Sequence, residues 1–281
     1  MESAGKSDVA TRDEERDRAQ VPADALPTKS NREILASTVA AGVNELRRPA
    51  GGLFFSGLAG GLEVGFGVVL MAVFATLAPG AAETPTGRLV MGALYSFGFI
   101  VVVVGRSELF TEHTSMVVFP VLNGDEGVGT LMRTWGIVYG ANVLGTVLFA
   151  YGCYLVLPAL GSASHEAFAA IGARLLEHSV AVIFGSAVLA GWLMGLVAWL
   201  VAAARDTISQ VLLVGLVTFA IGFASLHHCI AGSVEALGAV FGGGASVGDY
   251  LRFLVTASVG NALGGVLMVA AMRFGHATRT A

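Results

Sequence analysis

Six long apolar segments dominate this sequence, and two of them are interrupted by polar residues near their middles. A helix of about 20 residues crosses the hydrocarbon core of a bilayer, so every segment is long enough, and the second and fifth are too long for one straight helix. Only 13% of the residues are charged, against about 25% in soluble domains. The sequence therefore predicts an all-α membrane protein with six transmembrane helices. The segments cover about residues 51–78, 88–122, 130–157, 179–204, 207–243 and 248–272.

The two interruptions are at corresponding places in the two halves of the chain. They cover residues 105–113 and 222–230. When they are aligned on their first glycines, each has a leucine four residues later, Leu109 in the first and Leu226 in the second. Non-helical backbone at membrane depth is tolerated only where it is buried in protein or lines a watery cavity. Broken spans in corresponding halves therefore predict a transport site, in a channel or a carrier.

A second motif indicates an internal repeat. The third and sixth segments both contain Asn-x-Leu-Gly-x-Val-Leu, which begins at Asn142 and at Asn261, 119 positions apart (261 − 142). The interruptions are 117 positions apart when their glycines are aligned (222 − 105). Three segments per half place the second copy in the opposite orientation across the membrane. We therefore predict two inverted three-helix repeats, in which the second and fifth helices are broken.

The distribution of charge predicts how the chain is placed in the membrane. Residues 1–30 are rich in charge and lack the apolar run of a cleavable signal, so they are predicted to form a disordered cytoplasmic tail. A helix over 31–48 with one apolar face is predicted to lie at the membrane surface. Residues 31–275 are expected to form the transmembrane transport domain, and 276–281 a cytoplasmic end. Arginines gather in the loops on one side, which predicts that both termini are cytoplasmic. They are Arg47, Arg48, Arg133, Arg205, Arg273 and Arg279.

The sequence has no pattern typical of an enzyme. Cys153 and Cys229 lie in apolar segments without metal or redox spacing, so they are interpreted as inert packing residues. His227 and His228 are adjacent, so on a helix they would point about 100° apart and make a poor pair of metal ligands. No cofactor, metal ion or nucleic-acid partner is predicted.

Three short motifs carry a resemblance to a known family. They are Glu45-Leu46-Arg47-Arg48-Pro49, Leu109-Phe110-Thr111 and His228-Cys229-Ile230-Ala231. Together with the glycine and asparagine patterns, they resemble the formate/nitrite transporter family over about residues 31–275. The resemblance implies an aquaporin-like arrangement and a homopentamer in the inner (cytoplasmic) membrane, with one pore per protomer and lipid around it. It also implies passage of small monovalent anions or their conjugate acids, with proton coupling in several members.

The candidate pore residues follow from the resemblance and from side-chain chemistry. His228 matches the central pore histidine of the family, and an imidazole can donate a proton or a hydrogen bond to an anion near neutral pH; a neutral core histidine is the alternative. Thr111 matches a loop threonine that contacts substrate, and its hydroxyl can also satisfy backbone freed by the break. Leu109 and Phe110 are predicted to form an apolar constriction with Leu226, which is interpreted as the inverted counterpart of Leu109.

The chain departs from the family pattern in its polar residues. Many members have glutamate at the position of His227, asparagine at that of Gly232, and a lysine in the fourth segment. The lysines here, Lys6 and Lys29, both lie in the predicted tail. His227 is therefore a candidate second titratable group, and packing against a helix or lipid is its alternative role.

Four acidic side chains are unusual for apolar segments. Ionisable residues inside a membrane face partners or water, so these acids are candidate pore or loop charges, and Arg106 is a candidate partner for two of them, Glu108 and Glu112. The four are Glu63, Glu108, Glu112 and Glu235.

Two other functions fit the broken spans. A neutral-solute pore of aquaporin type is one, although no Asn-Pro-Ala occurs at either break. A sensor with a degenerate pore is the other, because the lysine, glutamate and asparagine of the family pattern are missing.

Overall fold

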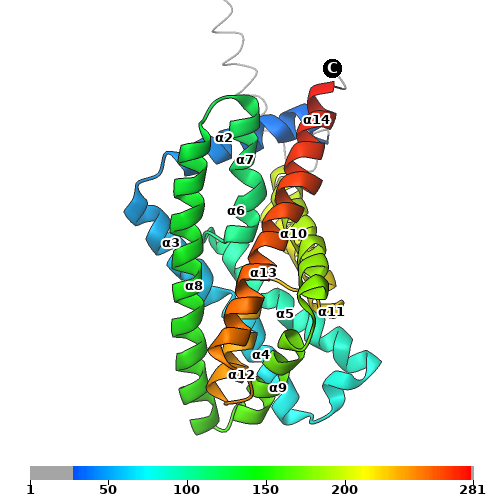
Figure 1. Cartoon of the computed structure of the whole chain (residues 1–281). Helices are drawn as coiled ribbons and strands as arrows, with labels where there is room; N and C mark the ends of the chain where they lie inside the picture. Colours follow the sequence, from blue (N-terminus) through cyan, green and yellow to red (C-terminus); the bar gives the residue numbers. More distant parts are fainter. Residues whose placement is uncertain (1–27, 280–281) are drawn as a thin grey trace, which may run out of the picture.

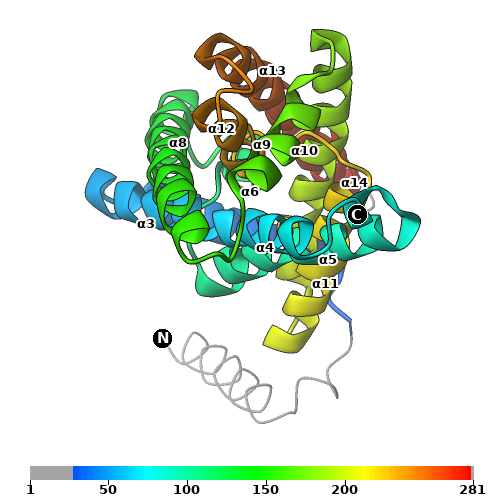
Figure 2. The same cartoon turned by 90° about the horizontal axis from the view of Figure 1, so that it is seen from below.

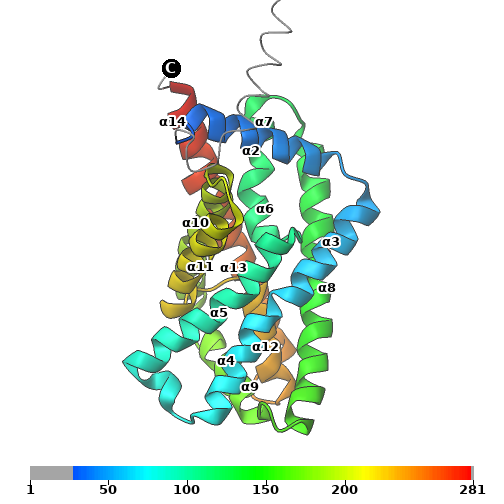
Figure 3. The ribbon, with the colours of Figure 1, turned by 180° about the vertical axis from the view of Figure 1, so that it is seen from behind.

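The computed structural model describes residues 28–279, and every regular element in that range is a helix (Figure 1). The predicted tail at residues 1–30 lies outside the described residues as far as residue 27, and so do the last two residues of the predicted cytoplasmic end. The two ends of the described chain lie at the same end of the helical bundle (Figures 1 and 3).

The elements follow one another in a simple order along the chain. They are α2 (Asn31–Leu46), α3 (Ala50–Glu63), α4 (Gly65–Leu77), the 3-10 turn η2 (Ala81–Glu83), α5 (Pro85–Gly105), α6 (Phe110–Met116), α7 (Val118–Asn123), α8 (Val128–Ala159), α9 (His165–Leu176), α10 (Val180–Ala203), α11 (Thr207–Phe223), α12 (Ala231–Phe241), α13 (Val247–Gly265), the π-helix η3 (Val266–Ala271) and α14 (Met272–Arg279).

Five stretches of the described chain are long and apolar enough to cross a membrane as continuous helices. They are Ala50–Leu77, Pro85–Gly105, Val128–Ala159, Val180–Ala203 and Val247–Arg279. The fifth segment expected from the sequence is divided between the shorter apolar helices α11 and α12. The chain is therefore an all-helical membrane protein, and the first, third and fourth predicted segments agree with continuous helices to within two residues at each end.

The stretch between the third and fourth apolar segments is also helical. Residues 158–178 contain α9. The hydroxyl of Ser164 accepts a hydrogen bond from the N–H of Ala167 (3.1 Å) and so caps the first turn of this helix. Phe168 and Leu175 are buried, and α9 packs against α12.

Both predicted interruptions are present, and they have the same backbone geometry. Arg106 and Ser225 have positive φ values of 63° and 53°, an uncommon conformation for residues other than glycine. After each of them, a backbone N–H returns to the helix just ended: Ser107 donates to the carbonyl of residue 102, and Leu226 donates to that of residue 221, each at 3.0 Å. These pairs are 119 positions apart (225 − 106 and 226 − 107).

This geometry corrects the alignment made on the glycines. The structural counterpart of Leu226 is Ser107, and the counterpart of Leu109 is His228. The interpretation of Leu226 as the counterpart of Leu109 was wrong, because α5 ends at Gly105 whereas α11 continues past Gly222 to Phe223. The corrected offset of 119 equals the spacing of the two asparagine motifs.

Close helix pairs surround the interruptions. Helix α3 packs against α8, α10 against α13 and α5 against α11, and α6 lies towards the middle of the bundle when it is seen from below (Figure 2). Glycines permit this approach: a Cβ on Gly61 would lie 2.3 Å from the carbonyl oxygen of Asn142, and a Cβ on Gly191 would lie 2.1 Å from that of Asn261. Small residues at such contacts are typical of helix association in membranes.

A single added methyl group tests this packing. Gly61→Ala is expected to lower the thermal midpoint of the purified protein in detergent, because the new Cβ forces α3 away from α8, at a cost of about 1–3 kcal/mol for overpacking. Gly140→Ala is the matched control on α8, where a Cβ would meet nothing within 4 Å. There the helix propensity of alanine should leave the midpoint unchanged or raise it. Equal midpoints for the two variants would contradict the prediction.

Candidate functional site

An asparagine holds the first interruption in place. Asn142, on α8, accepts a hydrogen bond from the backbone N–H of Phe110 (2.8 Å) and donates two, to the carbonyl oxygens of Gly57 (2.6 Å) and Glu108 (2.8 Å). It is fully buried. Its amide group therefore satisfies backbone groups that have lost their helical partners at the break.

A second asparagine makes the same three bonds in the other half. Asn261, on α13, accepts from the N–H of Cys229 (2.8 Å) and donates to the carbonyl oxygens of Ala187 (2.7 Å) and His227 (3.0 Å). It is also fully buried. Its two partners in the break follow those of Asn142 by 119 positions (229 − 110 and 227 − 108). Each interruption is therefore built as a rigid segment held by one buried amide.

The two interruptions meet at a direct hydrogen bond. The Nε2 of His228 lies 2.7 Å from the Oγ1 of Thr111, and both side chains are buried. The ring of Phe99, on α5, packs edge-on against the imidazole at a centroid distance of 5.0 Å. The structure thus brings together two predicted pore residues that are far apart in the sequence.

A backbone hydrogen bond determines which ring nitrogen of the neutral His228 carries the proton. The N–H of Ala231, the first residue of α12, donates to the Nδ1 of His228 (3.1 Å). A nitrogen that accepts a hydrogen bond carries a lone pair, so the proton of the neutral ring is on Nε2. His228 therefore donates from Nε2 to the hydroxyl oxygen of Thr111. An imidazolium would have to break the bond to Ala231.

The three residues predicted to form an apolar constriction, Leu109, Phe110 and Leu226, differ in burial and in their contacts. Leu109 is fully buried in the main core, and Leu226 is half-buried and packs against that core. The ring of Phe110 packs edge-on against Tyr139 at 4.9 Å and against Trp135 at 6.0 Å. These contacts surround the first break with apolar and aromatic groups.

His227 is held by a serine and a backbone carbonyl. Its Nδ1 lies 2.9 Å from the Oγ of Ser186, which also accepts from the His227 backbone N–H (3.0 Å), and its Nε2 lies 3.0 Å from the carbonyl of Leu175. Because a carbonyl only accepts, Nε2 carries the proton, and Nδ1 accepts from the serine hydroxyl. These contacts attach the second break to α9 and α10.

A partly buried charged cluster attaches the first break to the end of α2. The Nη1 of Arg48 donates to Glu45 (2.8 Å) and to Glu108 (2.7 Å). The Nδ1 of His113 lies 2.8 Å from the Oε2 of Glu108, and its Nε2 lies 3.8 Å from the Oε2 of Glu45. Glu108 is thus paired with Arg48 and His113, and not with Arg106 as hypothesised from the sequence.

The other three predicted acids are not gathered into one site. The Oε2 of Glu63 is buried without a hydrogen-bond partner and points towards Gly105, where a Cβ would lie 4.0 Å away. Glu112 is half-buried on α6, and its carbonyl oxygen accepts a bond from Ser115 (3.2 Å). Glu235 is half-buried on α12, at the contact with α9.

Sequence reasoning missed several residues of this region. Asn142 and Asn261 were read only as parts of a repeat, Glu45 only as part of a motif, and Ser186 was given no role. The signal for the asparagines was available, since a polar amide at the same place in two apolar segments needs a buried partner.

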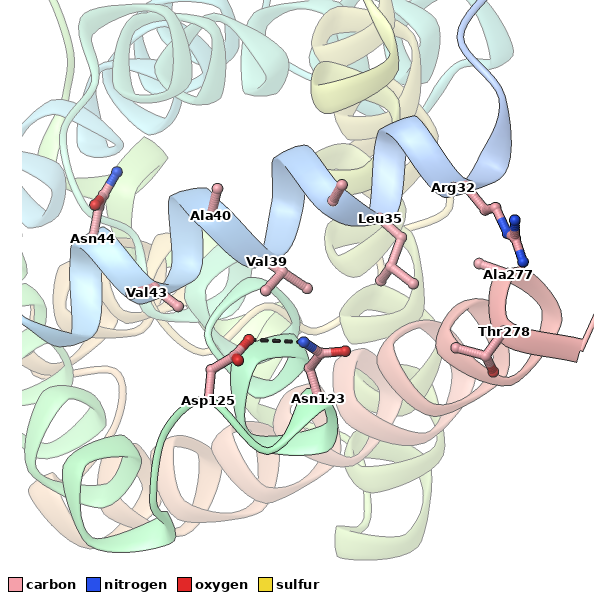
Figure 4. Close-up of a pocket in the computed structure, with 11 residues that line it drawn as sticks. Arg32, Leu35, Val39, Ala40, Val43, Asn44, Asn123, Asp125, Ala277 and Thr278 are labelled. Atoms are coloured by element: carbon pink, nitrogen blue, oxygen red, sulfur yellow. Dashed lines mark hydrogen bonds between the residues drawn. The ribbon is translucent and has the colours of Figure 1, made fainter. Parts of the chain in front are cut away.

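An open groove with a volume of about 690 Å³ lies at the end of the bundle that carries both ends of the described chain (Figure 4). It is formed by α2, α14 and the segment after α7, where Asn123 donates to Asp125 (2.8 Å). Its lining residues include none of the predicted pore residues, so it is separate from the two breaks.

Comparison with known families agrees with this geometry. A family model described as formate/nitrite transporter matches residues 32–275. The chain belongs to the formate/nitrite transporter family. This confirms the resemblance drawn from the three motifs, and it places the chain among transporters and channels.

Relatives of the chain include bacterial and archaeal proteins. The chain is 32% identical over 234 residues to the inner membrane protein YfdC of Escherichia coli, covering 82% of the chain and 74% of the relative. It is 27% identical over 247 residues to a probable formate transporter of Methanothermobacter thermautotrophicus, covering 80% and 89%. It is also 27% identical over 153 residues to the nitrite transporter NirC of E. coli, covering 53% and 54%.

Two solved structures share the fold. One is described as an FNT family ion channel, with a TM-score of 0.75 and 21% identity, over 86% of this chain and 98% of the other. The other is described as a pentameric formate channel with formate bound, with a TM-score of 0.64 and 22% identity, over 82% and 98%. The chain therefore has the fold of formate/nitrite transporter channels.

Proposed function

We propose that this protein is an inner-membrane channel or transporter for small monovalent anions, such as formate or nitrite, or for their conjugate acids. The observation that carries the proposal is the hydrogen bond between Thr111 and His228, which joins the two broken spans inside the bundle (2.7 Å). The names of two relatives, a probable formate transporter and a nitrite transporter, support this substrate class, as does the formate bound in one structural neighbour.

We infer that the transport domain consists of two inverted three-helix repeats. The equivalent bonds of Asn142 and Asn261 support this, as do the positive φ values of Arg106 and Ser225, because both pairs are 119 positions apart. With both ends of the described chain on one side, the arginine distribution favours a cytoplasmic location for that side.

We propose that the protein assembles as a homopentamer in lipid. The outer face of the last span is apolar, with exposed side chains at intervals of four residues, one helical turn apart. Such a face needs lipid or another protomer against it, and the pentameric structural neighbour favours the second for part of it. The exposed residues are Val247, Leu251, Val255, Val259, Leu263 and Leu267.

In the proposed mechanism an arriving anion replaces Thr111 as the partner of His228. The Nε2–H of His228 then donates to the anion, and the hydroxyl of Thr111 supplies a second donor. The apolar surroundings of Leu109, Phe110 and Leu226 make a bare anion costly to pass, so a hydrogen-bonded anion or its neutral acid crosses more easily. Proton coupling would follow if the acid is the species that passes. Glu63, Glu112 and Glu235 remain candidate charges along the path, and His227 is proposed as a positioning residue for the second break.

Flux through the purified protein in liposomes tests the proposal. Formate, nitrite and hydrosulfide would be compared from about pH 5 to about pH 8, the range in which imidazole groups titrate. We expect saturable flux of at least one anion, above that of protein-free liposomes. Flux of a neutral solute without any anion flux would favour an aquaporin-type pore. No flux of either kind from a correctly assembled oligomer would favour a sensor.

A further inference from the structure

One ring nitrogen of His113 has no partner. His113 lies on α6, two residues after Thr111, and only 1% of its surface is exposed. Its Nδ1 is bonded to Glu108, but its Nε2 is buried and makes no hydrogen bond. An unsatisfied buried polar atom is costly and needs an explanation.

The orientation of the ring resembles that of a metal ligand. When the Nδ1–H of a neutral histidine donates to a carboxylate, the lone pair is on Nε2, and this pairing is the usual outer support of a metal-bound histidine. The Nε2 of His113 lies 3.8 Å from the Oε2 of Glu45. That gap is too long for a hydrogen bond. It is close to the spacing of about 3.4 Å between two ligands on one tetrahedral Zn²⁺ ion.

We propose that His113 and Glu45 bind one divalent transition-metal ion such as Zn²⁺, with Glu108 orienting the imidazole and water at the remaining positions. One donor atom from each of the three residues lies within 4.8 Å of the others. Imidazole with carboxylate is a ligand set that suits Zn²⁺ rather than Mg²⁺ or Ca²⁺. A bound ion would attach the end of α2 to the first helix after the break.

The cluster has two carboxyl groups beside one guanidinium. Arg48 donates from the same nitrogen, Nη1, to Glu45 and to Glu108. Because Arg48 and the metal share the carboxylate of Glu45, they compete. Removing the guanidinium should therefore strengthen metal binding, whereas a purely structural ion-pair network would only be weakened by that change.

Metal binding to the purified, full-length oligomer tests the proposal. Protein stripped with a chelator would be titrated with Zn²⁺ by calorimetry, beside Glu45→Gln, His113→Gln, Glu108→Gln and Arg48→Gln variants. We expect one ion per chain in the wild type, and loss of that ion in the first two variants. Glu108→Gln should weaken binding about tenfold or more, as removal of an outer partner does. Arg48→Gln should tighten it.

A neighbouring ion pair supplies the matched control. Glu126 pairs with Arg47 at 2.7 Å and does not belong to the group of Glu45, Glu108 and His113, so Glu126→Gln should bind Zn²⁺ as the wild type does. Binding stabilises a folded protein, so Zn²⁺ should also raise the thermal midpoint of the wild type and of Glu126→Gln.

If His113→Gln does not assemble, Glu45→Gln at the end of α2 decides the question. Absence of binding in the wild type, or equal binding in wild type and Glu45→Gln, would overturn the proposal. Neither readout depends on flux, so their failure would leave the transport function untouched.

Discussion

Replacing either Asn142 or Asn261 with leucine is expected to abolish anion flux and to lower the stability of the folded protein by about 3 kcal/mol or more. Each asparagine makes three hydrogen bonds to the backbone around one break. Leucine has a similar size but makes none of them, so three buried backbone groups lose a partner at about 1–3 kcal/mol each. The measurements are the thermal midpoint in detergent and flux in liposomes.

Two further variants make this expectation specific. Asn→Asp at either position keeps the volume and the acceptor, but it replaces the donating NH2 group with a carboxylate oxygen, which cannot donate to the two backbone carbonyl oxygens. It should therefore be nearly as damaging as leucine. Asn123→Leu is the control, since Asn123 bonds only to the exposed Asp125 among the described contacts. Wild-type flux from an Asn→Asp variant would show that the donated bonds do not hold the breaks. Unequal losses at the two positions would argue against equivalent halves.

The spans and the interruptions could be predicted because hydropathy and helix length are local properties. The second and fifth apolar segments are too long for one straight helix. The polar residues at 105–113 and 222–230 indicated the positions at which the helices break. The register between the halves could not be predicted in this way. It depends on how far each helix continues before its chain turns, and the glycines at 105 and 222 mark different distances from the turns at Arg106 and Ser225. The asparagine motifs, at the true offset of 119, were the better guide.

The candidate site was predictable only in part, for a different reason. Thr111 and His228 were chosen separately, and the bond between them arises because two distant breaks meet inside the bundle. Predicting the charged cluster would also have required the position of α2. This helix must lie across the end of the bundle before Glu45 and Arg48 can reach Glu108 and His113. The sequence showed acids and a nearby arginine, but that arginine, Arg106, is not the partner of Glu108. Proximity along the chain does not identify partners in a fold built from long helices.

His228→Ala is expected to reduce anion flux about tenfold to a hundredfold in a protein that still assembles. In the proposed mechanism the Nε2–H of His228 donates to the passing anion, and a hydrogen bond to a charged group contributes about 1.5–3 kcal/mol, where about 1.4 kcal/mol corresponds to a factor of ten. Thr111→Val should lose less, because one of two donors remains. Thr111→Ser keeps the hydroxyl and should behave as the wild type.

His228→Gln separates hydrogen bonding from titration. A glutamine amide can donate a hydrogen bond but does not gain or lose a proton in the physiological range. Because the N–H of Ala231 occupies the Nδ1 of His228, the neutral ring is the form that the site holds, and a donor that never titrates should replace part of its function. His228→Gln is therefore expected to retain more flux than His228→Ala, with the pH profile of the wild type. If the glutamine variant is as inactive as alanine, the imidazole must change its charge during transport. In that case the bond to Ala231 has to open in every cycle.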